Sequence, residues 1–128
     1  MVKCILELNE QQTDIVIKAL ELYSRIGTGQ VNAILSHPVN EQLEAEAHFE
    51  ADKALFEYKK IVFPELKAPG DSMSLRNEEV VVESKNAYDI MQAMKHEVAL
   101  ADKKGEHSVW RFEPRIAGNL NLPACRLA

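Results

Sequence analysis

The apolar residues of this chain follow two different periods, and the change between them predicts the first elements. Over residues 2–8 every second position is apolar, which is the period of a half-buried strand. These positions are Val2, Cys4, Leu6 and Leu8. Asn9 and Gln12 then stand at the spacing of a capping box, in which each side chain bonds the backbone of the other. The pattern predicts a strand followed directly by a helix.

Apolar residues at helical spacing predict a helix over residues 15–26. Its expected inner face contains Ile15, Val16, Ala19, Leu20, Leu22, Tyr23 and Ile26. Gly27 and Gly29 interrupt the pattern, because a glycine inside a helix costs roughly 1 kcal/mol relative to alanine. Helical spacing resumes over residues 31–35, so we expect two helical pieces joined by a kink or a short loop.

A second long helix is predicted over residues 41–62, with Asn40 as its cap and Pro64 beyond its end. Its expected inner face contains Leu43, Ala47, Ala51, Ala54, Leu55, Tyr58 and Val62. Its outer face is acidic, with Glu41, Glu44, Glu46, Glu50, Asp52 and Glu57. Residues 64–77 are rich in proline, glycine, serine and aspartate, which predicts a long connection of the kind that often carries function.

The C-terminal half completes the expected fold. The valines of residues 79–82 favour a short strand, with an extended loop as the alternative. Ser84 or Asn86 caps a third helix that ends near residue 104, and residues 108–113 alternate as a strand. We therefore predict an α+β fold, with three main helices packed on a small antiparallel sheet, in a single domain spanning residues 1–128.

Composition limits the possible functions. The 128 residues suit one domain, and 46% hydrophobic with 27% charged residues is ordinary for a globular protein. A net charge of -5 argues against binding to a nucleic acid polymer. No apolar run has the length of a membrane span, and no signal-peptide pattern begins the chain. Cys4 and Cys125 fit free thiols in the cytoplasm, with a disulfide between them as the alternative.

Catalytic and metal-binding patterns are weak. His48 shares a helix face with Glu44 and Asp52, which could hold a metal ion, although a solvated acidic face is the commoner outcome. Neither cysteine stands in a catalytic motif, and the Gly-x-Ser-x-Gly motif of hydrolases does not occur. A pair of acid–base carboxylates would be invisible at this level. We expect a binding protein, not an enzyme, and one that uses no cofactor or metal.

The best candidate for a binding site lies around the two glycines. Tyr23, Arg25, Thr28 and Gln30 supply an aromatic ring, a guanidinium, a hydroxyl and an amide, and this combination suits phosphate or carboxylate recognition. From spacing alone, a helix kink with a surface arginine is the commoner interpretation. Further candidates lie toward the C-terminus: Tyr88, Lys95, His96 and Arg111. The tyrosines also fit a core role with solvated hydroxyls.

Residues 19–30 (ALELYSRIGTGQ) and 87–96 (AYDIMQAMKH) together resemble a family of small phage and prophage proteins. In that family a strand, a Leu-Tyr-Ser-Arg-Ile-Gly helix and a Tyr-Asp-Ile-x-Gln helix recur in this order, and the resemblance extends from Leu6 to Phe112. It points to the Thoeris anti-defence sponges, which capture cyclic ADP-ribose isomers or cyclic oligonucleotides and so silence bacterial immune signalling. Lys95 stands where the family has arginine, which keeps the charge and loses bidentate phosphate geometry. The stretch around Met73 is also less aromatic than in the family.

The resemblance implies a homo-oligomer in the host bacterial cytoplasm that encloses a small anionic nucleotide between subunits. It implies that Arg25 and Lys95 bind the phosphates and that the ligand is not turned over. Two alternatives remain. The acidic helix of residues 41–62 could face a basic protein partner, which would make the chain an inhibitor of a host defence protein, or the chain could hydrolyse the same signals as a phosphodiesterase.

Overall fold

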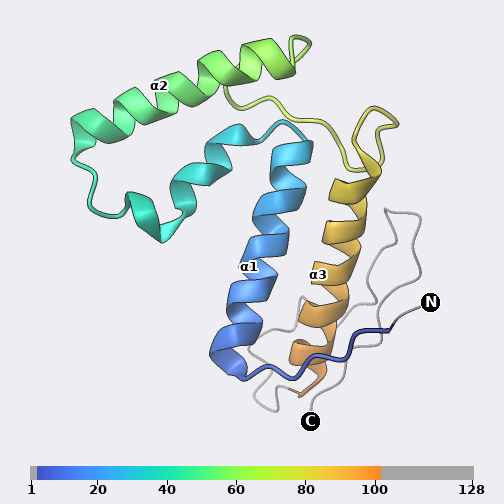
Figure 1. The fold of residues 1–128 in the computed structure, drawn as a ribbon. Coiled ribbons are helices and arrows are strands. Elements are labelled where there is room, and N and C mark those ends of the chain that lie inside the picture. Colours follow the sequence, from blue (N-terminus) through green and yellow to red (C-terminus); the bar gives the residue numbers. More distant parts are fainter. Residues whose placement is uncertain (1–2, 102–128) are drawn as a thin grey trace.

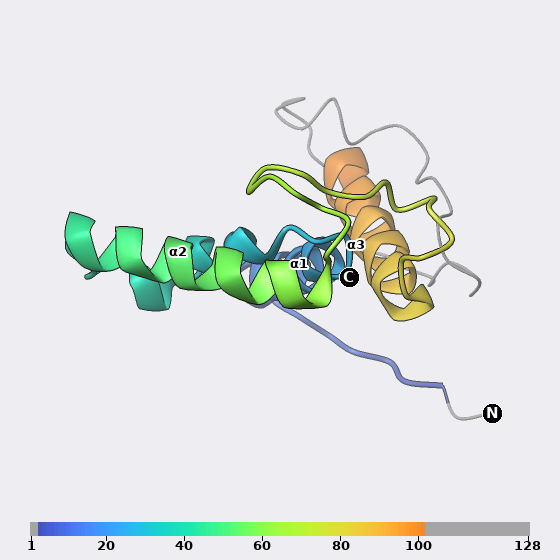
Figure 2. The same cartoon turned by 90° about the horizontal axis from the view of Figure 1, so that it is seen from above.

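The computed structural model describes residues 3–101, and within them the fold is helical (Figure 1). Three α-helices and two short 3-10 helices occur in the order α1 (Glu10–Gly27), η1 (Val31–Ser36), η2 (Pro38–Asn40), α2 (Ala45–Val62) and α3 (Val82–Ala101). Helices α1 and α3 lie antiparallel and in contact. Residues 31–62, here called the arm, extend away from this helix pair in both views (Figure 2). None of the helices described here is both long and apolar enough to cross a membrane.

Helix α1 begins at the predicted capping box. The Asn9 side chain accepts a hydrogen bond from the Gln12 backbone N–H at 2.8 Å, and the Gln12 side chain accepts one from the Asn9 N–H at 3.0 Å. Two N–H groups that the first turn leaves without helical partners are thereby satisfied. The predicted start of this helix is confirmed.

Helix α1 ends in a Schellman motif, which accounts for the interruption predicted at the glycines. The Gln30 N–H donates to the Arg25 carbonyl at 3.0 Å, and the Gly29 N–H donates to the Ile26 carbonyl at 3.1 Å. Gly29 has φ +91°, in the left-handed region that glycine adopts without strain. The chain then turns into η1, so the prediction of two helical pieces joined by a short connection is confirmed.

Small side chains are buried where α1 and α3 meet. Ser24 of α1 and Thr28, the residue that caps α1, are buried, as are Ser84 and Ala87 of α3. The buried hydroxyls of Ser24 and Thr28 donate to carbonyls one turn earlier in α1, at 2.9 and 2.8 Å, so they carry no unsatisfied donor. The absence of a side chain on Gly27 lets α3 begin directly against α1. A Cβ atom there would lie 1.8 Å from Ser84 Oγ.

The predicted inner face of α1 is only partly buried. Val16, Leu20, Leu22 and Ile26 are half-buried, whereas Ala19 is exposed. Ile15 is 67% exposed and Tyr23 is 54% exposed, and Ile17, which the prediction left out, is buried. Residues two positions apart lie on nearly opposite sides of a helix, so the buried side is turned from Ile15 toward Ile17.

Helix α2 confirms one predicted boundary and corrects the other. It ends at Val62, before Pro64 as predicted, but it begins at Ala45 and not at residue 41. Residues 38–40 form η2 instead, with the His37 ring accepting from the Val39 N–H at 3.0 Å.

The predicted inner face of α2 is largely exposed. Helix α2 packs on η1 through a side that includes the half-buried Leu55 and Phe56, while Tyr58 and the 80% exposed Ile61 face solvent. Ala47 and Ala54, which we also expected inside, are exposed as well. The arm is therefore a layer in which η1 covers one side of α2 only.

The predicted antiparallel sheet is wrong for the part of the chain that the structure describes, which contains no strand. Residues 3–8 have no regular structure, and Ile5 is 90% exposed. Val80 is buried in a turn in which its N–H donates to the Asn77 carbonyl, and Val82 already belongs to α3. Alternation supplies a strand's side-chain pattern, but a strand also needs a neighbouring strand for its backbone groups. Within residues 3–101 neither segment has such a neighbour. The predicted strand at 108–113 lies outside the described residues.

Replacing Gly27 by alanine is expected to destabilise the protein. The added Cβ would meet Ser84 Oγ at 1.8 Å and Ser84 Cβ at 2.5 Å, so the two helices must separate. Overpacking of this kind costs about 1–3 kcal/mol, which exceeds the helix propensity that alanine gains. Thermal and urea denaturation should show the loss.

Gly70→Ala is the matched control, because a Cβ at Gly70 meets nothing within 4 Å. It should be neutral or slightly stabilising. Adding Ser84→Gly to Gly27→Ala should recover part of the lost stability, since the clashing side chain is then gone. Equal effects at Gly27 and Gly70, or strictly additive effects of Gly27→Ala and Ser84→Gly, would contradict the close approach.

Candidate functional site

A cleft of about 390 Å³ lies between α1 and α3. The connection from α2 to α3 forms its third wall. The lining comprises Glu21, Ser24 and Arg25 of α1, Thr28 and Gln30 after it, Met73 and Leu75 of the connection, and Tyr88, Met91, Gln92 and Lys95 of α3. Small-molecule sites commonly have volumes of about 300–1,000 Å³, so this cleft lies toward the lower end of that range.

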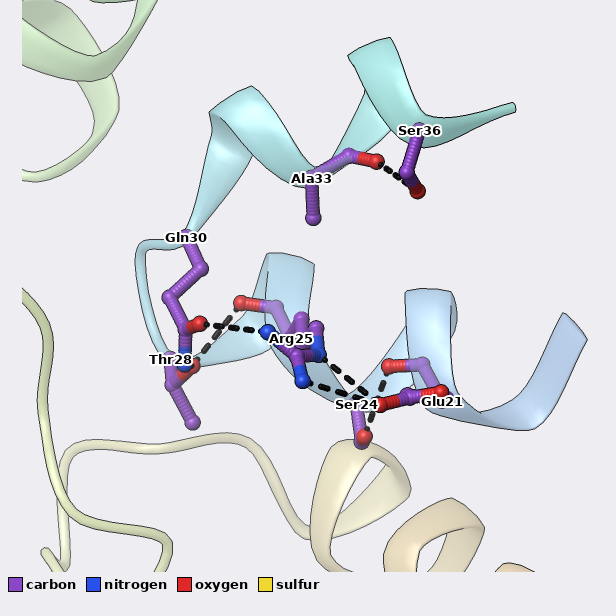
Figure 3. Close-up of polar contacts among 7 residues, drawn as sticks. All are labelled: Glu21, Ser24, Arg25, Thr28, Gln30, Ala33 and Ser36. Atoms are coloured by element: carbon purple, nitrogen blue, oxygen red, sulfur yellow. Dashed lines mark hydrogen bonds and ion pairs between the residues drawn. The ribbon is translucent and has the colours of Figure 1, made fainter. Parts of the chain in front are cut away.

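Arg25 is held in place by two neighbours (Figure 3). Its Nη2 and Nε atoms donate to Glu21 Oε1 at 2.9 and 3.2 Å, and its Nη1 atom donates to Gln30 Oε1 at 3.2 Å. Gln30 in turn donates through Nε2 to the Thr28 hydroxyl at 3.1 Å. The guanidinium is therefore oriented in advance, with N–H groups left over for a ligand, since an arginine carries five.

The Schellman motif explains why Arg25 and Gln30 meet. They occupy the two positions, C3 and C″, whose side chains usually make an apolar contact in this motif. Here those positions carry a guanidinium and an amide, so the cap of the helix places the hydrogen-bonded Arg25 and Gln30 side chains in the cleft. Both side chains of the Glu21–Arg25 ion pair are partly exposed, at 34% and 48%, so solvent reaches this wall.

The remaining walls combine a second cation with apolar surface. Lys95 brings another positive charge from α3, and Tyr88 lies on the same helix two turns earlier. Met73, Leu75 and Met91 supply apolar atoms. A site of this composition suits a ligand that has both an anionic group and a flat apolar part.

The connecting wall is fixed to α1 and to α2. The Met73 N–H donates to the Thr28 carbonyl at 2.9 Å, which joins the connection to the end of α1. Lys59 of α2 is only 2% exposed. Its ammonium donates to the carbonyls of Ala68, Pro69 and Asp71. A lysine ammonium has three N–H donors, so the three carbonyls use all of them. The connection between α2 and α3 is thereby folded around the charge of Lys59.

Five of the eight residues predicted to bind a ligand line this one cleft: Arg25, Thr28, Gln30, Tyr88 and Lys95. Tyr23 does not line it and lies on the exposed side of α1. His96 is on α3 and is not part of the lining. Arg111 lies outside the described residues.

Sequence reasoning missed Glu21, Ser24, Met73, Leu75, Met91 and Gln92. One of them had a usable signal, because Glu21 stands four residues before Arg25, the spacing of a helical ion pair. For Met73 and Leu75 the sequence indicated only that residues 64–77 form a connection of a kind that often carries function. Their place in the cleft depends on how Lys59 folds that connection.

The possible metal site on α2 gains no support from the structure. Among residues 3–101, no three His, Cys, Asp or Glu side chains are close enough together to hold a metal ion. Glu44 precedes α2 as its N-cap residue, and its carbonyl accepts from the His48 N–H at 2.9 Å as ordinary helix geometry requires.

Searches of protein-family models, of curated proteins and of solved structures each gave no match.

Lys59→Met should loosen the cleft wall. The methionine keeps the apolar stem, but three carbonyls lose a charged donor, and a hydrogen bond to a charged group contributes about 1.5–3 kcal/mol. We expect a stability loss in that range, together with faster amide exchange over residues 66–73. Lys60→Met is the control, because Lys60 pairs with Glu57 at the surface and such pairs contribute little. Similar losses in the two variants would contradict the role given to Lys59.

Proposed function

We propose that the cleft between α1 and α3 binds a cyclic nucleotide, either a cyclic ADP-ribose isomer or a cyclic oligonucleotide, and holds it without chemical change. In a phage this activity would sequester an immune signal of the host and so act against its defence. The observation that carries the proposal is the convergence of Arg25 and Lys95 on one cleft from helices far apart in sequence. The resemblance independently assigns the phosphates to these two residues.

The lining supports this ligand chemistry. A guanidinium and an ammonium are the usual partners of phosphate in proteins, and Arg25 is already oriented by Glu21 and Gln30. Tyr88 and the two methionines offer an aromatic and a polarizable surface against which a nucleobase can pack. A protein that sequesters a signal needs affinity and specificity, and it needs no catalytic group.

We also propose that the protein acts as a homo-oligomer. Ile15 and Tyr23 on α1, and Phe49 and Ile61 on α2, are large apolar or aromatic side chains that are more than half exposed. Association of two copies would bury apolar side chains of this kind. The modest volume of the cleft fits the same proposal, because a second copy could supply the further surface that a cyclic oligonucleotide needs.

A thermal-shift panel on the purified protein tests the ligand. It should contain cyclic dinucleotides, cyclic trinucleotides and cyclic ADP-ribose isomers. A ligand at about a hundred times its dissociation constant adds roughly 2.7 kcal/mol, enough to raise the melting temperature by several degrees. We expect a selective shift, with the ligand recovered intact after heat denaturation. A degraded ligand would favour the phosphodiesterase alternative, and a flat panel would contradict the proposal.

Arg25→Ala should weaken binding of the shifting ligand by about 10-fold or more, because charge-assisted hydrogen bonds contribute about 1.5–3 kcal/mol each. Lys18→Ala is the matched control. It removes one positive charge from the same helix, at an exposed ion pair with Asp14 that does not line the cleft. Isothermal titration of both variants should separate a local contact from a general effect of charge. Equal losses would contradict the site.

A second candidate function rests on the arm. Helix α2 exposes Glu46, Glu50 and Glu57 together with Phe49 and Ile61, a surface that suits a basic protein partner with apolar patches. Under this alternative, reversing the charge of Glu44, Glu46 and Glu50 should abolish anti-defence activity in cells, while Arg25→Ala should not. If the protein instead sequesters a cyclic nucleotide, Arg25→Ala should abolish anti-defence activity and the charge reversal should not.

A further inference from the structure

We infer that Glu21 weakens the attraction of the cleft for nucleotides with a terminal phosphate and so favours phosphodiester rings. This inference rests on the proposed function, and it adds the class of phosphate group that the site accepts. Neither the sequence pattern nor the resemblance assigns a role to Glu21.

Glu21 places a carboxylate beside the group that should bind phosphate. Its Oε1 atom lies 2.9 Å from Nη2 of Arg25 and 3.2 Å from Nε, and both residues line the cleft. A phosphate that bonds the guanidinium must therefore approach this carboxylate as well. The side chain of Glu21 is 34% exposed, so the charge is only partly screened by water.

The repulsion depends on the charge of the ligand. A terminal phosphate monoester carries about 1.5 to 2 negative charges near pH 7, whereas a phosphodiester carries only about one. Coulomb repulsion from a fixed carboxylate grows in proportion to the ligand charge. Closing a nucleotide into a ring removes the terminal monoester, so a cyclic ligand meets the smallest repulsion per phosphate.

Glu21 also orients Arg25, and the two roles can be separated. Glu21→Gln keeps an oxygen that can accept from the guanidinium while it removes the charge. Glu21→Asp keeps the charge on a shorter side chain. If the charge produces the selectivity, the aspartate variant should retain it and the glutamine variant should lose it, although glutamine is the closer match in size.

Such selectivity would matter for a sponge. Linear nucleotides with terminal phosphates share the base, ribose and phosphate groups of a cyclic signal, and they are abundant in any cytoplasm. A cleft with only Arg25 and Lys95 would attract them more strongly than the signal, because they carry more charge. A carboxylate inside the cleft opposes this preference, and in doing so it lowers the affinity for every anion to some degree.

The test is isothermal titration of the full-length protein, its Glu21→Gln variant and its Glu21→Asp variant. The probes are ATP, inorganic pyrophosphate and the cyclic nucleotide that gives the largest thermal shift. For Glu21→Gln we expect affinity for ATP and pyrophosphate to rise about 10-fold or more, and affinity for the cyclic nucleotide to rise about threefold or less. Glu21→Asp should stay within about threefold of the unmodified protein for all probes.

Asp14→Asn is the control, because it removes one negative charge from α1 outside the cleft lining. It should leave the ratio of affinities unchanged. Equal gains for all probes in Glu21→Gln, or no gain for ATP and pyrophosphate, would overturn the inference. A change in the ratio for Asp14→Asn as large as that for Glu21→Gln would also overturn it, because net charge would then explain the effect.

The two proposals fail in different ways. If no cyclic nucleotide binds the unmodified protein, the proposed function fails, whereas a gain for ATP and pyrophosphate in Glu21→Gln still shows that the Glu21 carboxylate repels terminal phosphates. If a cyclic nucleotide binds and Glu21→Gln does not change the ratio, the proposed function stands and the inference is wrong. A melting temperature of each variant without ligand confirms that the folded protein is being compared.

Discussion

The C-terminal cap of α1 is the constraint from which most of this structure follows. At Gly29 the backbone enters the left-handed region, and the two hydrogen bonds of the Schellman motif close the helix. After these residues the chain continues into the arm. The start of α3 packs against Gly27, and the Thr28 carbonyl accepts a hydrogen bond from Met73 in the connection between α2 and α3. The cap also sets Arg25 beside Gln30. The end of α1 thereby sets the direction of the chain after the helix and the position of the Arg25–Gln30 pair in the cleft.

The cleft is lined by two helices and by a connection without regular secondary structure. Helices α1 and α3 supply charged and aromatic groups on rigid backbones, while the connection supplies Met73 and Leu75 on a backbone without regular structure. That backbone is held by the ammonium of Lys59, which belongs to the arm. The arm is thus a structural support of the cleft as well as a surface. The exposed glutamates of α2 lie in solvent, whereas Lys59 of the same helix is buried.

Local signals in the sequence predicted local structure, and the rest depended on partners that a sequence does not display. Asn9 with Gln12, the glycine interruption and Pro64 correctly marked helix boundaries, because each acts on the backbone within a few residues. The predicted caps Asn40 and Ser84 or Asn86 were wrong, since α2 begins at Ala45 and α3 at Val82. The strands at 2–8 and 79–82 were wrong over the described residues because pairing is a non-local requirement. The predicted inner face of α1 was right only in part, because Ile15, Ala19 and Tyr23 are exposed whereas the polar Ser24 is buried. The sequence predicted Arg25 and Lys95 as ligand-binding residues, but only the fold shows that they line the same cleft.

The two glycines at the end of α1 are required for reasons unrelated to any ligand. A side chain at Gly27 would collide with Ser84, and one at Gly29 would be strained and would also lie 2.3 Å from Leu66. Neither glycine lines the cleft. In a saturation mutagenesis experiment scored by activity, both positions would therefore tolerate few replacements, much as a residue that contacts the ligand would. A map of mutational tolerance would mark this short segment as a hot spot, and only a parallel measurement of protein abundance would separate its architectural residues from Arg25.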